Sequence, residues 1–167
     1  RYAHGNGLNP LMFPTLRKYE TEVVSMTASM LNGDASVVGA LTSGGTESIL
    51  MTIKTYRERA RALFPHIKKP EILCPITIHP AFEKAGHYFD VKVVHAPVDD
   101  KTKKVDVAAL EALISPNTIA ICVSAPQYCH CIIDPIEDVA KVALRHSLPL
   151  HVDACYGGFI LPWIEKL

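Results

Sequence analysis

Apolar and polar positions follow two different spacings along the chain. In the first, apolar residues recur three or four positions apart, which predicts amphipathic helices over about 16–30 and 49–64; Asn32-Gly33 and Pro65 supply the stop signals. In the second, short apolar runs predict strands, and the run 118–124 is apolar enough to predict a buried strand. These runs are 37–41, 71–75, 91–95, 118–124 and 148–152. Shorter helices are predicted over 80–89, 107–114 and 135–146, the last two with Asp106 and Asp134 as N-caps.

Strands that alternate with helices of this length predict an α/β fold. The sheet is expected to be mostly parallel, with helices flanking its faces. The opening segment 1–14, which is rich in Gly, Asn and Pro, is predicted to lack regular secondary structure. Residues 15–167 are expected to form part of one domain. No internal repeat or interdomain linker is visible in the sequence.

Composition narrows the class of protein. The 167 residues are 49% hydrophobic, enough for a packed core, and 17 basic residues balance 17 acidic ones. Because no long basic block stands out, we expect no nucleic-acid partner. No stretch resembles a membrane-spanning helix or a signal peptide. The chain starts without methionine and ends within an amphipathic pattern, so we expect both ends to be cut from a longer protein.

The cysteines are odd in number and lie mostly in apolar runs. This pattern suits buried free thiols in a reducing, cytosolic compartment better than a disulfide framework. The short run Cys129-His130-Cys131 lacks the spacing and the second pair that structural zinc requires, so no metal is expected. The five cysteines are Cys74, Cys122, Cys129, Cys131 and Cys155.

The segment 42–48, which follows one apolar run and precedes a helix, is a candidate anion site. Gly44 and Gly45 let the backbone approach an anion, and the first-turn N–H groups and the helix dipole favour negative charge there. The hydroxyls of Ser43, Thr46 and Ser48 could donate as well. Neither Gly-Lys-Ser/Thr nor G-x-G-x-x-G is present, so ATP and NAD are disfavoured. A tight turn with a capping hydroxyl remains an alternative interpretation.

Other candidate residues follow the predicted strands, where ligands of parallel sheets gather. Asp153 ends an apolar strand, and its carboxylate is costly to bury unless a cation or strong donor pairs with it. A protonated ring nitrogen of a cofactor would be such a partner. Alternatively, the carboxylate caps the N-terminus of a helix or forms a buried salt bridge. His79 precedes a helix and could stack on a flat ligand or simply fill a loop. The sequence contains no G-x-S-x-G motif, which forms the nucleophile elbow of many serine hydrolases, so a hydrolase of that kind is disfavoured.

Three sets of residues together resemble the pyridoxal-phosphate-dependent group II decarboxylase superfamily. They are the segment 42–51, Phe13-Pro14 with Arg17-Lys18, and His151-Val152-Asp153-Ala154. Two further segments are similar to the branch whose members cleave phosphorylated sphingoid bases. These are 125–135, with its Ala125-Pro126-Gln127-Tyr128, and 149–159. The resemblance covers essentially the whole chain.

This resemblance implies part of the large domain of a fold-type I, aspartate aminotransferase-like enzyme that binds pyridoxal 5'-phosphate. Gly45 and Thr46, with Ser43 and Gly44, would hold the cofactor phosphate. His79 would stack on the pyridine ring.

The resemblance also implies the remaining site residues. Asp153 would pair with the ring nitrogen and keep it protonated, which makes the ring an electron sink. Asn6 would line the substrate mouth. Tyr128 and His130 would lie near the reacting end, completing the catalytic set with Asp153 and His79.

The implied reaction is cleavage of a phosphorylated sphingoid base to a long-chain aldehyde and phosphoethanolamine. An amino-acid decarboxylase on the same fold, and a non-catalytic binding protein, are the alternatives. The lysine that links the cofactor in this superfamily would lie beyond Leu167, so we expect the chain as given to be inactive. The resemblance further implies a homodimer with a cytosol-facing site, anchored in eukaryotes to the endoplasmic reticulum by a helix upstream.

Two departures from the branch stand out. Asn6-Gly7-Leu8-Asn9 occurs where an Asn-Pro-Leu-His is typical, and Cys129 and Cys131 occupy positions of Pro and Gly. We expect these differences to affect substrate preference more than cofactor binding.

Overall fold

The structure, a computed structural model, describes residues 5, 8–9 and 11–164. The chain divides into two compact units, one formed by Arg1–Ser43 with Pro162–Leu167 and the other by Gly44–Leu161.

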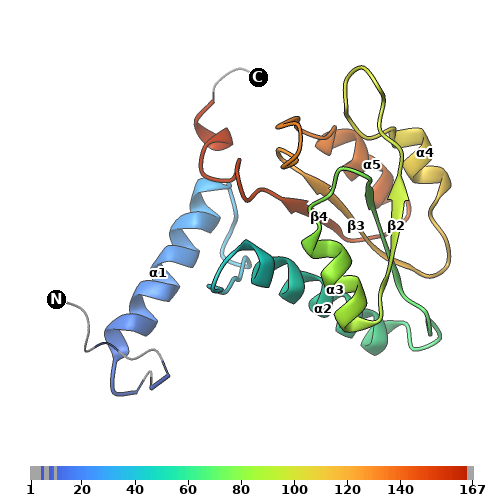
Figure 1. Cartoon of the computed structure of the whole chain (residues 1–167). Coiled ribbons are helices and arrows are strands. Elements are labelled where there is room, and N and C mark those ends of the chain that lie inside the picture. The colour runs from blue at the N-terminus through green and yellow to red at the C-terminus, as the bar shows by residue number, and fades with distance from the viewer. Residues whose placement is uncertain (1–4, 6–7, 10, 165–167) are drawn as a thin grey trace. The chain divides into compact units, whose positions relative to one another are not determined.

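The second unit is built on a four-stranded sheet in which every pairing is parallel (Figure 1). Its spatial order is β2-β1-β3-β4. All residues of the two central strands are buried, as their continuous apolar sequence requires. The strands are β1 (Glu71–Pro75), β2 (Lys92–Ala96), β3 (Thr118–Ser124) and β4 (Leu150–Asp153).

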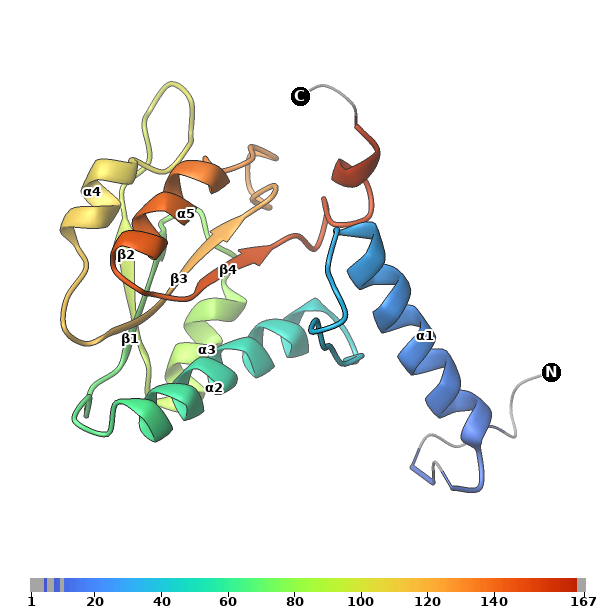
Figure 2. The ribbon, with the colours of Figure 1, turned by 180° about the vertical axis from the view of Figure 1, so that it is seen from behind.

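Two pairs of helices enclose this sheet (Figures 1 and 2). Helices α2 and α3 pack with Ile72 and Cys74 in one hydrophobic cluster, whereas α4 and α5 pack with Leu73 and Ile121 in another. Successive residues of β1 therefore face opposite layers, as the two-residue period of a strand dictates. The helices are α2 (Gly45–Leu63), α3 (Ala81–Phe89), α4 (Val107–Ala112) and α5 (Ile136–Arg145).

The first unit contains helix α1 (Pro14–Met30) and the irregular segment that follows it. Proline stands at the first turn of α1, where its missing N–H costs nothing. The helix buries none of its residues, and Leu41 donates its backbone N–H to Glu20 Oε1 at 3.3 Å. The short 3-10 turn η1 (Leu161–Trp163) lies near the end of the described chain. Within the described chain, no helix has both the length and the apolar character needed to cross a bilayer.

The α/β architecture and the parallel sheet are confirmed, and the strands 71–75 and 118–124 agree with their predicted bounds to the residue. Asp106 caps α4 as expected, accepting the Ala109 N–H at 3.0 Å. The predicted strand over 37–41 is wrong. Its residues are largely exposed, Val38 to 90%, and no neighbouring strand pairs with them in the described structure.

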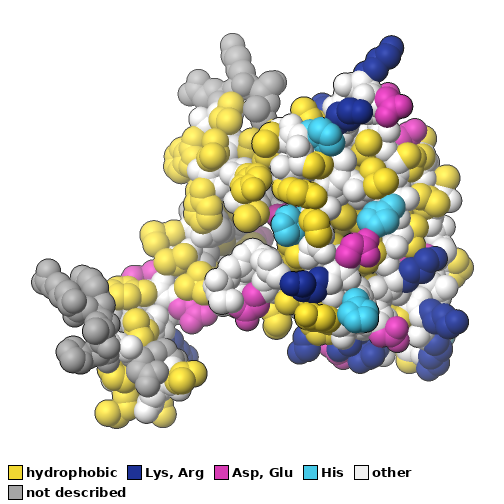
Figure 3. Space-filling model, viewed as in Figure 1, with side chains coloured by type: hydrophobic (Ala, Val, Ile, Leu, Met, Phe, Trp, Pro, Cys, Tyr) yellow, Lys and Arg dark blue, Asp and Glu magenta, His cyan; other side chains and the backbone are white. Residues whose placement is uncertain are grey.

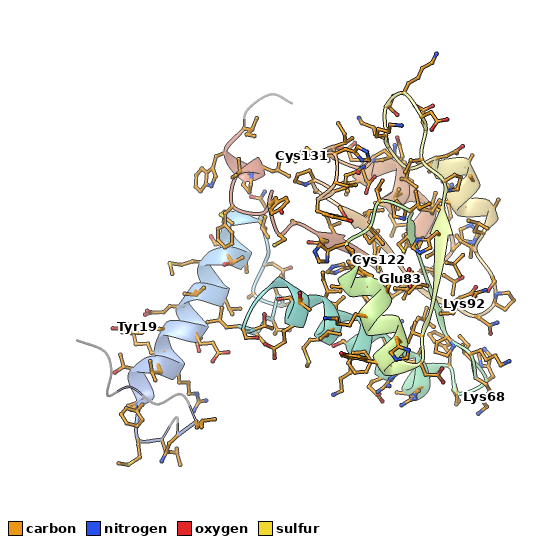
Figure 4. The ribbon with its side chains drawn as sticks, viewed as in Figure 1. Tyr19, Lys68, Glu83, Lys92, Cys122 and Cys131 are labelled. Carbon is orange, nitrogen blue, oxygen red and sulfur yellow. The ribbon has the colours of Figure 1, made fainter. Side chains whose placement is uncertain are left out.

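Two further expectations need correction. Asp134 does not cap α5, whose N-cap is Pro135 without a side-chain hydrogen bond. The buried carboxylate accepts the Ser124 N–H instead, at 2.9 Å, because it is turned toward the end of β3. Of the five free thiols only Cys74 and Cys122 are buried; the other three follow the strands in exposed loops. Figure 4 shows Cys122 within the sheet and Cys131 in the loop beyond it.

Candidate functional site

The candidate site lies at the carboxyl edge of the sheet in the second unit. Ser124 and Asp153, the last residues of β3 and β4, are register partners, and Ala125 donates its N–H to Asp153 O at 2.8 Å. The loop after β1 carries His79, which precedes α3. Because all four strands run parallel, these residues share one edge, as the sequence predicted.

Asp153 is held at this edge by its own backbone surroundings. Its Oδ1 accepts the Cys155 N–H at 3.0 Å, which fixes the carboxylate while the residue remains partly exposed. The negative charge of Asp153 reaches two neighbours in the sheet. Burial is the main cause that raises the pKa of Cys122, and Asp153 raises it further; burial lowers the pKa of His151, and Asp153 partly offsets this.

His79 is fixed from two sides. Its Nδ1 accepts the Ala81 N–H at 3.1 Å, so the proton of the neutral ring is on Nε2. The Tyr128 ring meets it edge-on, with ring centroids 5.1 Å apart and planes at 67°. The structure thus brings together two predicted site residues from different loops. Figure 3 shows histidine side chains exposed among apolar ones over this unit.

The start of α2 lies beside the segment that follows β4. A Cβ built on Gly45 would stand 3.3 Å from Cys155 Sγ, so glycine allows this close approach. Gly45 is the first residue of the 19-residue helix, with Gly44 as N-cap and Thr46 next. The helix N-terminus, with its outward N–H groups, therefore lies close to the residues that follow Asp153.

Two predicted residues are not among the described residues of the second unit. Ser43 belongs to the first unit. Asn6 lies outside the described residues.

The structure also identifies residues that sequence reasoning did not assign. Thr77 is buried and its Oγ1 has no hydrogen-bond partner. Gln127 is completely buried, and its side chain contacts both Cys129 and His130. The sequence places Gln127 in a loop, where a polar residue is usually exposed, so no local signal reveals its burial.

Comparison with known families gives a match over residues 3–167 to the family described as "Pyridoxal-dependent decarboxylase conserved domain". Among curated proteins, the sphingosine-1-phosphate lyase of Dictyostelium discoideum is 48% identical over 166 residues, 99% of this chain and 31% of the relative. Sphingosine-1-phosphate lyase 1 of Rattus norvegicus is 49% identical over 165 residues, 99% of this chain and 28% of the relative. The chain thus spans less than a third of the length of these relatives.

Solved structures share the fold. The sphingosine-1-phosphate lyase of Burkholderia pseudomallei matches with a TM-score of 0.90 and 39% identity, covering 96% of this chain and 38% of that structure. The glutamate decarboxylase of Lactobacillus brevis matches with a TM-score of 0.85 over 97% of this chain and 40% of that structure. Its identity of 24% supports a common fold alone.

Proposed function

Because the chain belongs to the pyridoxal-dependent decarboxylase family, we propose that it forms the cofactor-holding part of a carbon–carbon lyase. Its substrate would be a phosphorylated sphingoid base, split into a long-chain aldehyde and phosphoethanolamine. The proposal is supported by the position of Asp153 and His79 after parallel strands at one edge of the sheet, with the start of α2 beside Cys155, in a chain nearly half identical to curated lyases.

The residues present fit pyridoxal phosphate. Gly44, Gly45 and Thr46 form the start of a long helix, where backbone N–H groups and the helix dipole favour a phosphate. The partnerless hydroxyl of Thr77 is a further buried polar atom at the same sheet edge. Ser43 directly precedes these residues in sequence and would add a hydroxyl donor.

The ring of the cofactor would be held by Asp153 and His79. Asp153 is oriented by the Cys155 N–H and would accept a hydrogen bond from the ring nitrogen. His79 is fixed by Ala81 and Tyr128 and would present its ring face. When bound, pyridoxal phosphate supplies a protonated ring that accepts the electron pair released when the substrate bond breaks.

The reaction also needs a proton acceptor for the substrate hydroxyl. Tyr128 and His130 are the described candidates, because both are exposed side chains in the loop after β3. Asn6 would complete the substrate mouth. We further propose that the active protein is a homodimer with its site facing the cytosol, at the endoplasmic reticulum in a eukaryotic host; light scattering and organelle fractionation would test these two points.

The runner-up is an amino-acid decarboxylase on the same fold, consistent with the description of the matched family as a decarboxylase domain. The higher identity to the lyases favours the lyase. A non-catalytic binding protein is the third candidate. The assay that separates them uses the protein expressed from the complete reading frame that contains this chain, supplied with pyridoxal phosphate. Aldehyde release from a phosphorylated sphingoid base supports the lyase, and carbon dioxide release from an amino acid supports the decarboxylase. If neither product forms, the result supports the non-catalytic binding protein.

Asp153→Ala tests the site itself. Removing one preorganised charge from a reacting centre costs about 10²–10³-fold in kcat, and we expect a loss of that order. Asp138→Asn is the matched control, since Asp138 is a carboxylate on the exposed side of α5 that pairs with Lys141 at 2.7 Å. Equal turnover in the two variants would reject the role of Asp153.

A further inference from the structure

Gln127 is a completely buried polar side chain that contacts two exposed residues, Cys129 and His130. Its Nε2 donates to Lys103 O at 2.8 Å. Its Oε1 lies 2.9 Å from Cys129 Sγ and 2.9 Å from His130 Nδ1. The amide is thus bonded at both of its ends.

These contacts determine which way the amide points. A backbone carbonyl can only accept a hydrogen bond, so the group facing Lys103 O must be the NH₂ of Gln127. The amide oxygen then faces Cys129 and His130. Because that oxygen can only accept, the short contact with His130 requires a proton on Nδ1.

The thiol of Cys129 does not reverse this assignment. Its Sγ lies 3.1 Å from His130 Nδ1, close enough to donate to a bare nitrogen. A bare Nδ1, however, would leave two acceptors facing each other across 2.9 Å, an unfavourable arrangement for a buried amide. The neutral His130 ring therefore carries its lone pair on Nε2.

We propose that Gln127 is a positioning residue that holds His130 as the Nδ1–H tautomer, so that Nε2 can accept a proton. The role in turnover rests on the function proposed above, whereas the tautomer does not. In the reaction, the proton of the substrate hydroxyl passes to Nε2, giving an imidazolium whose Nδ1–H remains donated to Gln127. Gln127 itself does not touch the substrate.

Two variants at this position separate the acceptor from the buried packing. Gln127→Met keeps a similar size but removes both the donor and the acceptor. Gln127→Glu keeps an oxygen facing His130 whether or not its buried carboxyl is ionised, and burial favours the neutral form, which can still donate to Lys103 O. The acceptor facing His130 is thus lost in the first variant and retained in the second.

The direct measurement is nitrogen NMR of the protein labelled with ¹⁵N in its histidine rings, with the His130 signals identified by their loss in His130→Asn. We expect the Nδ1–H tautomer in the unsubstituted protein and in Gln127→Glu, and loss of this single tautomer in Gln127→Met. An Nε2–H ring in the unsubstituted protein overturns the proposal by itself, even if a variant fails to fold. Identical ¹⁵N spectra of the Gln127→Met and Gln127→Glu variants would also overturn the proposal.

Turnover gives the second readout. Gln127→Met should lower kcat by about 10- to 100-fold, less than the about 10²–10⁴-fold that a whole general base contributes, with little change in KM. Gln127→Glu should retain most of the activity. Met and Glu variants of equal kcat would contradict the positioning role.

A control variant addresses general disturbance of a buried polar residue. Glu71 is buried at the opposite, amino edge, where Ser115, Thr118 and Lys92 pair with it. Glu71→Gln should leave the His130 tautomer and kcat unchanged, and a changed tautomer would show that the signal is not specific. If the unsubstituted protein has the expected tautomer but cleaves no sphingoid base, the proposed function fails while the tautomer assignment stands.

Discussion

Gly157→Ala is expected to damage both the stability of the second unit and its carboxyl edge. A Cβ built at Gly157 would lie 2.0 Å from Ala125 O and 2.6 Å from Leu161 Cδ1. The leucine side chain can rotate away, but the carbonyl is backbone. It is also held in place, because the N–H of Ala125 is bonded to Asp153 O at 2.8 Å.

The magnitude follows from this overlap. Carbon atoms of this kind essentially never come within 3.0 Å of such an oxygen, so the backbone must move by at least 3.0 − 2.0 = 1.0 Å. Overpacking of this kind costs about 1–3 kcal/mol. For a chain of this size each kcal/mol lowers Tm by about 2–4 °C, so Tm should fall by about 2–12 °C.

Thermal unfolding followed by circular dichroism measures this loss, with Leu144→Ala as the control. Leu144 is 79% exposed, and its truncation should change stability by no more than about 0.5 kcal/mol. The Gly157 variant should also bind pyridoxal phosphate more weakly, because Ala125 leads into the loop of Tyr128 and His130. A Tm equal to that of the unsubstituted protein would refute the steric argument.

Two further predictions concern the same edge. Cys131 has a φ of 54°, in the left-handed region that glycine adopts without penalty, so Cys131→Gly should raise the free energy of unfolding by up to about 1 kcal/mol; a urea titration that shows no gain contradicts this. Burial raises the pKa of Asp134 above its ordinary 3.8, so the unfolded chain binds fewer protons between the two pKa values and stability falls as the pH rises through that window. Asp134→Asn should flatten this part of the pH profile of unfolding, and an unchanged profile would rule out Asp134 as its source.

The fold was largely predictable because its signal is local. The run 118–124 is apolar throughout and became a strand buried at every position. The run 37–41 has a similar composition but formed no strand, because an apolar run needs a neighbouring strand to pair with. Composition alone cannot reveal that neighbour.

The site was predictable in part, for a related reason. Strand ends in a parallel sheet share an edge, so the pattern of strands places Asp153, at the end of β4, and His79, in the loop after β1, at the same edge. Asp134 was assigned as a cap because it precedes a helix, whereas its carboxylate bonds the end of β3 ten residues earlier. The hydrogen bond of Gln127 to Lys103 spans 24 residues and has no sequence signature.

The two edges of the sheet differ in how well their buried polar groups are satisfied. At the amino edge, Glu71 has three partners. At the carboxyl edge, Thr77 Oγ1 and Asp134 Oδ1 are buried without a hydrogen bond, and Cys131 adopts a backbone conformation that favours glycine. Each of these features costs stability, and such costs tend to cluster where a site must hold a ligand. We therefore expect the carboxyl edge, where the proposed cofactor would bind, to be locally less stable than the amino edge, and hydrogen exchange of the backbone amides at the two edges would test this.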